Sequence, residues 1–237
     1  MPAGAVGILL THRAGHFVGR GDRFGRRAVM TVPRDTHEAD RTGMVRVGRI
    51  LSNIISPPIM FAAIGFALGV YERPIWPGLA WGFVYGSLVA VTPLLVIAWL
   101  MHIGRIRELH MSNTQERHIP YLTSVISSAV AFLILTLFNG PELLRCLSVL
   151  SAITLGVLGL INTKWLISIH ATAAGATWMI ATVVFGWVAG AILLPFVILI
   201  SAIRLYLKRH TPAQVLAGLA LGISTVLAMR AFGCFVP

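Results

Sequence analysis

Long apolar stretches separated by short polar segments dominate the chain after Arg49. Each stretch has about the 17 to 25 residues with which a helix crosses the roughly 30 Å hydrocarbon core of a bilayer. The pattern predicts an all-α integral membrane protein with about six to seven transmembrane helices. The stretches that carry them cover residues 50–71, 77–101, 120–138, 143–161, 168–188, 191–207 and 212–232.

Prolines and glycines within these stretches predict how the helices bend and pack. Pro57-Pro58 and Pro195 should kink their helices, because proline removes a backbone hydrogen bond of the helix. Glycines four residues apart let helix backbones approach closely. Such pairs occur at residues 65 and 69, 82 and 86, and 218 and 222.

The composition excludes a water-soluble globular domain. Of the 237 residues, 57% are hydrophobic and only 11% are charged, with a mean hydropathy of +0.82, whereas about a quarter of the residues of soluble domains are charged. The two cysteines, Cys146 and Cys234, are too few for a disulfide framework and match no metal-ligand spacing.

Residues 1–48 differ from the rest of the chain because they are rich in arginine and glycine and show no apolar period. We interpret them as a basic, flexible N-terminal arm that precedes a transmembrane domain at residues 49–237. Such an arm is suited to rest on anionic lipid headgroups. Two alternatives stay open, namely disorder or a true start further along, near Met30 or Met44.

The positive charges predict an orientation. The chain has 19 Lys and Arg against 8 Asp and Glu, and in a membrane protein this excess sets orientation more often than it binds nucleic acid. Counting crossings places sixteen of the nineteen on the side of the arm and of segments 102–119, 162–167 and 208–211. The positive-inside tendency makes that side cytoplasmic in a multi-pass protein of the cell membrane. An anion-binding site on that side would account for some of these charges instead.

Residues capable of chemistry gather on this same side, in loops two crossings apart. They are Arg105, Arg107, His110, Arg117, Lys164, Ser168, His170, Arg204, His210 and Gln214. Arginines and histidines with few carboxylates favour an oxyanion ligand, and phosphate is the obvious candidate. No aspartate follows Asp40, so we expect neither a carboxylate-bound metal nor another cofactor.

One of these segments resembles a known signature. Arg204 precedes His210 by six positions, and Gln214 follows four positions later, at the start of an apolar stretch. This arrangement is similar to the third signature of the type 2 phosphatidic acid phosphatase superfamily, the lipid phosphatase and haloperoxidase-like proteins. In that signature an Asp stands where this chain has Gln214.

Two weaker elements extend the resemblance to about residues 50–235. Ser168-Ile169-His170 is similar to the Pro-Ser-Gly-His of the second signature, and Arg117 sits where the first signature ends in Arg-Pro. The order of the three elements along the chain also fits the family.

The resemblance implies a metal-independent phosphatase that hydrolyses a lipid or isoprenoid phosphate or diphosphate through a phosphohistidine. On this reading His210 is the nucleophile and His170 protonates the leaving alkoxide. The other implied roles are the binding of phosphate oxygens by Arg117, Arg204 and Ser168, added positive charge from Lys164, and orientation of the nucleophile by Gln214.

Departures from the signatures motivate an alternative. Gln214 replaces a carboxylate and Ile169 replaces a glycine, which fits a non-catalytic membrane subunit that binds anionic lipid or packs in a membrane complex. Thr211 and Gln214 also match a helix capping box, a role compatible with either function. Lys208 and Arg209 read most simply as cations at the lipid–water boundary. Membrane lipids are the expected surroundings in every case, and nucleic acid is not an expected partner.

Overall fold

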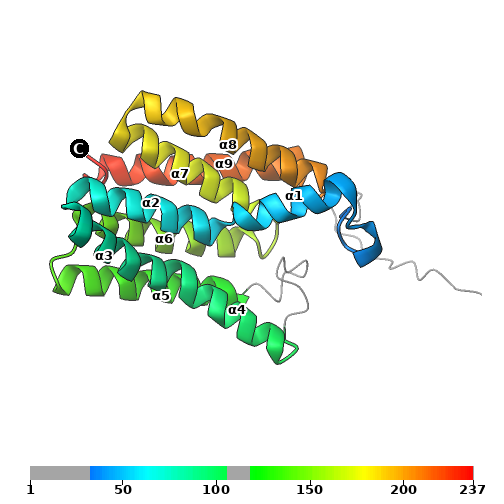
Figure 1. The fold of residues 1–237 in the computed structure, drawn as a ribbon, viewed down its shortest axis with the longest axis horizontal. Coiled ribbons are helices and arrows are strands. Elements are labelled where there is room, and N and C mark those ends of the chain that lie inside the picture. Colours follow the sequence, from blue (N-terminus) through cyan, green and yellow to red (C-terminus); the bar gives the residue numbers. More distant parts are fainter. Residues whose placement is uncertain (1–32, 106–117, 237) are drawn as a thin grey trace, which may run out of the picture. The chain divides into compact units, whose positions relative to one another are not determined.

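A computed structural model describes residues 33–105 and 118–236, which are helical and contain no β-strand (Figure 1). All of them fall within one compact unit. The elements are η1 (Glu38–Asp40), α1 (Gly43–Ile54), α2 (Pro57–Glu72), α3 (Ile75–Gly86), η2 (Ser87–Val91), α4 (Thr92–His102), α5 (His118–Leu137), α6 (Glu142–Ile161), α7 (Ile169–Phe185), α8 (Trp187–Tyr206) and α9 (Pro212–Ala231). The prediction of an all-helical protein is thus confirmed for the described residues.

The first predicted stretch is two helices rather than one. α1 ends at Ile54 and α2 begins at Pro57, with a bend of 44° between them. Proline is well suited to the first turn of a helix, where its missing N–H costs no hydrogen bond. The predicted kink at Pro57-Pro58 is therefore confirmed, whereas α8 runs as one helix through Pro195.

The second predicted stretch is a continuous helical segment of 28 residues, Ile75–His102. It contains the π-helical turn η2, which ends just before Thr92-Pro93. Pro93 has no N–H to donate to the preceding turn, and a wider turn is one way in which a helix absorbs that loss. The Thr92 hydroxyl donates to the carbonyl of Ser87 at 3.0 Å and so supports the turn.

Several helices are suited to a membrane. Within the described residues five helical segments are long and apolar enough to cross one, and six when α1 and α2 are taken together as one bent span. The remaining predicted span corresponds to α7, which has 17 residues and stands at the short end of the crossing range. The structure therefore supports a multi-pass protein with five to six such helices.

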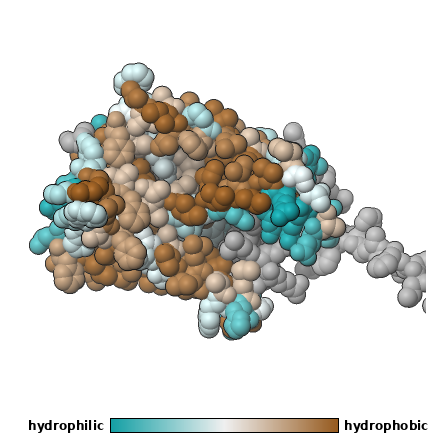
Figure 2. All heavy atoms as spheres, in the orientation of Figure 1, coloured by the Kyte–Doolittle hydropathy of each residue, from teal (hydrophilic) through white to brown (hydrophobic). Residues whose placement is uncertain are grey.

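The surface of the bundle is apolar over a wide area. Figure 2 shows hydrophobic residues across most of the visible face, with hydrophilic ones gathered toward its two ends. Phe83, Leu160 and Leu216 are 67%, 74% and 64% exposed. Side chains of this kind are expected to face lipid, because an apolar patch of this size is rare on soluble monomers.

Glycines bring α2 and α3 together. A methyl group at Gly65 would lie 2.5 Å from the ring of Tyr85, and one at Gly69 would lie 2.6 Å from the carbonyl oxygen of Gly78. At Gly82 it would meet the Phe66 ring at 2.6 Å. These backbones can touch only because the side chains are absent, so the predicted close approach is confirmed here.

The same device joins α7 to α9. A methyl group at Gly218 would lie 2.6 Å from the carbonyl oxygen of Ser168, and one at Gly222 would collide with the carbonyl of Thr172. On the facing helix, a methyl group at Gly175 would lie 2.8 Å from the carbonyl oxygen of Leu219. The N–H of Ser168, before the first residue of α7, also donates to the carbonyl of Gln214 in the first turn of α9 at 3.1 Å. The contacts thus start at the beginnings of both helices and continue along them, so α7 and α9 run side by side in the same direction.

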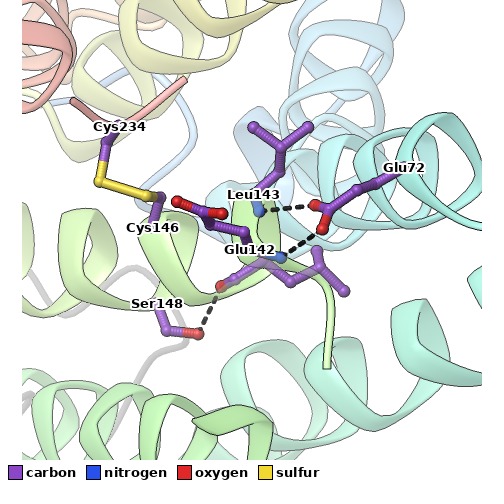
Figure 3. Close-up of a disulfide and its surroundings, with 7 residues drawn as sticks. Glu72, Glu142, Leu143, Cys146, Ser148 and Cys234 are labelled. Atoms are coloured by element: carbon purple, nitrogen blue, oxygen red, sulfur yellow. Dashed lines mark hydrogen bonds between the residues drawn. A yellow bond between two sulfur atoms is a disulfide. The ribbon is translucent and has the colours of Figure 1, made fainter. Parts of the chain in front are cut away.

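At the other end of the bundle, Cys146 and Cys234 form a disulfide (Figure 3). It links α6 to the segment after α9. Nearby, the carboxylate of Glu72 accepts the N–H groups of Glu142 and Leu143 at 2.6 and 2.7 Å and so caps α6. We call this region the disulfide end. The sequence does not predict this disulfide, because the two cysteines are 88 residues apart and no local pattern joins them.

Candidate functional site

A cavity of about 290 Å³ opens at the end of the bundle where α7 and α9 begin. Its polar lining includes Ser52 on α1, Tyr121 on α5, His170 on α7, Arg204 on α8 and His210 in the turn between α8 and α9. We call this region, with the turns 162–168 and 207–211, the pocket end. Three of the side chains that the sequence singled out, His170, Arg204 and His210, therefore line one cavity.

The rest of the cavity wall is largely apolar. It is formed by residues at the break between α1 and α2, on α4, on α6 and at the start of α7. They include Pro57, Pro58, Ile59, Pro93, Leu94, Ile97, Leu155 and Ile169. The cavity thus joins a polar part to an apolar part, and an amphiphilic ligand has the matching chemistry.

Ser52 connects two of the candidate residues. Arg204 Nη1 donates to Ser52 Oγ at 3.0 Å, and His170 Nε2 lies 3.4 Å from the same oxygen and 3.2 Å from the Ser52 carbonyl. Ser52, His170 and Arg204 are 0%, 7% and 4% exposed. Buried polar groups need such partners, so Ser52 fixes the imidazole and the guanidinium relative to each other. No feature of the sequence singles out Ser52, which is one serine in an amphipathic helix.

His170 owes its place to the start of α7. Ser168 is the N-cap residue, and its hydroxyl accepts the N–H of Ala171 at 3.4 Å. Ser168 is buried and does not line the cavity. In the structure its side chain supports the helix that carries His170, whereas the resemblance implied a contact with phosphate.

His210 is held by a backbone carbonyl. Its Nδ1 lies 3.2 Å from the carbonyl oxygen of Leu166, in the turn that leads to α7. When Nδ1 carries the hydrogen of a neutral ring and donates it to this carbonyl, the lone pair stands on Nε2. That tautomer is the one a histidine nucleophile attacking through Nε2 requires.

Gln214 has a structural contact. Its Oε1 accepts the N–H of Thr211 at 2.9 Å, and the Thr211 hydroxyl accepts the N–H of Gln214 at 3.3 Å. The capping box that these two residues match is confirmed. Gln214 does not line the cavity. The sequence suggested that Gln214 orients the imidazole of His210, but in the structure the carbonyl of Leu166 contacts that ring at Nδ1.

The other two expected residues take no described part in the cavity. Lys164 is exposed in the turn after α6 and is not part of the lining. Arg117 lies outside the described residues. The implied roles of both residues therefore stay predictions.

Sequence reasoning also missed Asn162, at the end of α6. Asn162 is buried, its side-chain nitrogen donates to the Tyr121 hydroxyl at 2.7 Å, and its oxygen accepts the N–H of Ile167 at 2.8 Å. It thereby ties the turn before α7 to α5. An asparagine just after an apolar stretch reads only as a helix end, so its tertiary contact had no signal.

The described part of the cavity lining carries basic side chains and no acidic ones. Arg204 and two histidines line it, and no Asp or Glu belongs to the part of its lining that the structure describes. Within residues 33–105 and 118–236, no three His, Cys, Asp or Glu side chains are grouped as metal ligands would be. Comparisons with protein-family models, with curated proteins and with solved structures found no match to the chain.

Proposed function

We propose that this protein is a membrane-embedded, metal-independent phosphatase that hydrolyses a lipid or isoprenoid phosphate or diphosphate through a phosphohistidine. Its bundle would then be a divergent form of the lipid phosphatase fold. The observation that carries the proposal is the convergence of His170, Arg204 and His210, from three separate segments, on one cavity.

The chemistry needs two balanced steps. His210 attacks phosphorus with Nε2, the bond from phosphorus to the leaving oxygen breaks, and His170 delivers a proton to that oxygen. Water then attacks the phosphohistidine, gives its proton to His170, and releases phosphate. Arg204 binds the phosphate oxygens on which negative charge accumulates.

The apolar wall supports the lipid part of the proposal. Pro57, Pro93 and Leu94 line the same cavity as the two histidines, so an apolar chain attached to the phosphate has a surface to contact. A substrate already dissolved in the bilayer would not have to leave it completely to reach Arg204. Phosphatidic acid and isoprenyl diphosphates both match this description.

Hydrolysis by the purified protein tests the proposal directly. We expect His210→Ala to lower phosphate release from phosphatidic acid or farnesyl diphosphate by about a thousandfold or more, as the loss of a nucleophile does in other enzymes. His102→Ala is the matched control, since His102 is an exposed histidine at the end of α4. Equal release by the wild-type protein and His210→Ala would contradict the catalytic role.

A second candidate function keeps the cavity without the reaction. Gln214 stands where the family has a carboxylate, its side chain caps α9, and Ile169 contributes to the cavity wall. These features favour a non-catalytic subunit that binds an anionic headgroup. In that case the wild-type protein and His210→Ala would release no phosphate, while Arg204→Met would lose binding to vesicles that contain phosphatidic acid.

We also propose that the pocket end faces the cytoplasm. The excess of positive charge on that side supports it, and so does the disulfide at the other end, because disulfides persist mainly in oxidising compartments. Cys146 and Asn162, the residue that follows α6, are about 24 Å apart along the helix axis, which is most of the thickness of a bilayer core.

Cysteine labelling tests this orientation. We expect an impermeant maleimide to label Arg73→Cys in intact cells and to leave Thr163→Cys unlabelled until the cells are opened. Thr163 is exposed in the turn after α6, and Arg73 is exposed at the disulfide end. Labelling of Thr163→Cys in intact cells would reverse the orientation.

A further inference from the structure

Part of the N-terminal arm is bound to the pocket end. We call residues Pro33–Arg41 the N-terminal clamp. The N–H of Arg34 donates to the carbonyl of Leu207 at 3.1 Å, and its guanidinium lies over the ring of Tyr206, 4.7 Å from the centroid. These contacts place the clamp on the last turn of α8.

Asp35 lies at the centre of the clamp. It is 0% exposed, and its two carboxylate oxygens accept Arg209 Nε at 2.9 Å and Nη2 at 2.8 Å. Arg49 of α1 lies 3.6 Å from the same carboxylate and donates to the Asp35 carbonyl at 3.2 Å. Two oxygens facing two guanidinium nitrogens fix both the distance and the angle of Arg209.

A buried pair of this kind needs a reason other than stability. Removing a carboxylate and a guanidinium from water costs free energy that their attraction often fails to recover. What the pair provides is a defined geometry for the segment that carries Arg209. The next residue in that segment is His210.

The turn around His210 is tightly specified on both sides. Lys208 adopts a left-handed backbone conformation with φ of 53°, and the N–H of Arg209 donates to the carbonyl of Arg204 at 3.1 Å. His210 then contacts the Leu166 carbonyl. A non-glycine residue keeps such a φ only where its surroundings hold it, and the bond between Arg209 and Asp35 is one of those restraints.

We infer that Asp35 is a positioning residue, which holds His210 in the cavity by fixing Arg209. The inference rests on the proposed function, because it assigns a purpose to the position of His210. It also changes the reading of Arg209, whose guanidinium is bound to Asp35 and not directed to lipid headgroups. The clamp is then part of the site, although it precedes the first apolar stretch.

The test compares Asp35→Asn with Asp40→Asn, which removes an exposed carboxylate of the same clamp. We expect Asp35→Asn to lower kcat for phosphatidic acid by about 10- to 100-fold with little change in KM, as the loss of residues that orient a catalytic group does. Asp40→Asn should behave as wild type, and Asp35→Glu should recover part of the rate.

A second measurement does not depend on turnover. Diethyl pyrocarbonate modifies neutral histidine rings, and peptide mass spectrometry gives its rate at His210 relative to the exposed His102. We expect Asp35→Asn to raise that ratio several-fold, because the turn is loosened and the charge of Arg209 is no longer balanced. Asp40→Asn should leave the ratio unchanged.

The outcomes separate the two ideas. An inactive wild-type protein whose His210 still responds to Asp35→Asn contradicts the proposed function and supports the positioning role. Equal His210 modification rates in Asp35→Asn and Asp40→Asn overturn the positioning role. A lower thermal midpoint, with activity lost only in proportion to unfolded protein, overturns it as well.

Discussion

The two ends of the bundle are held together by different kinds of contact. At the disulfide end, the covalent bond from Cys146 to Cys234 and the cap from Glu72 to α6 join backbone segments directly. At the pocket end, Arg204 and His170 both contact Ser52 beside a cavity. The first set of contacts closes the structure, whereas the second holds charged and titratable groups next to open space.

The contacts at the disulfide end are suited to stabilise the fold, whereas those at the pocket end are suited to bind a ligand. A polar contact that leaves no space for a ligand contributes to folding, and its loss should change stability. A polar cluster on a cavity is costly to bury and is expected where it has a ligand to bind. Variants of matched type at the two ends should therefore affect different properties.

The largest expected effect is on catalysis at the pocket end. Arg204→Met should lower kcat/KM for phosphatidic acid by about 100- to 1,000-fold, since one lost contact to developing negative charge costs this much in other enzymes. Arg230→Met removes an exposed arginine near the disulfide end and should leave the rate unchanged. Equal effects from the two variants, in monodisperse protein, would remove the distinction between the ends.

The next effect is on stability at the disulfide end. Cys146→Ser should lower the free energy of unfolding by about 2 kcal/mol, at the low end of the range for disulfides, because helices inside a membrane retain much of their order when they separate. Thermal unfolding with and without reductant measures it, and the Cys146→Ser protein should no longer respond to reductant. A matching fall in kcat at a temperature where the protein is folded would show that the disulfide also controls the site.

The close contact between α7 and α9 gives a further test. Gly222→Ala should destabilise the protein by about 1 to 3 kcal/mol, because the added methyl group collides with the Thr172 carbonyl and forces α7 from α9. At Gly156, also within a helix, the nearest atom would lie 4.0 Å away. Gly156→Ala should therefore be neutral or slightly stabilising, and thermal midpoints of the two variants provide the comparison.

The smallest effect is expected at Gln214. Replacing it by Ala should remove its half of the capping box and lower stability by about 1 kcal/mol, with kcat nearly unchanged, because the Leu166 carbonyl holds His210. Gln214→Glu keeps an oxygen acceptor of the same length and serves as the control. A large loss of kcat in Gln214→Ala with normal stability would return Gln214 to the role of orienting the nucleophile.

Local features of the sequence predicted most of the helices. Apolar stretches of membrane length and the Pro57-Pro58 pair were enough to place the helices and one break, because both effects act over a few residues. The α7 region shows the limit of that reasoning. Its apolar run continues across Phe185-Gly186, but the helix ends at Phe185 before Gly186, which has a φ of 90°.

The candidate site was predictable only in part. His170, Arg204 and His210 stood out because histidine and arginine are rare in apolar surroundings and recurred on one side of the predicted membrane. Ser52 and Asn162 did not, because serine and asparagine are ordinary at helix ends and their partners lie 152 and 41 residues away. The tertiary structure alone supplies those partners.

By itself, then, the sequence determined the helical, apolar character of this protein and the chemical groups available to a site. The tertiary structure decided which of those groups meet. Glycine contacts between α7 and α9 bring His170 and His210 to one end, and Asp35 joins them from a segment that has no apolar period. The physical reason is range: helix formation depends on neighbours along the chain, whereas a cavity, a buried ion pair and a disulfide depend on residues that only packing brings together.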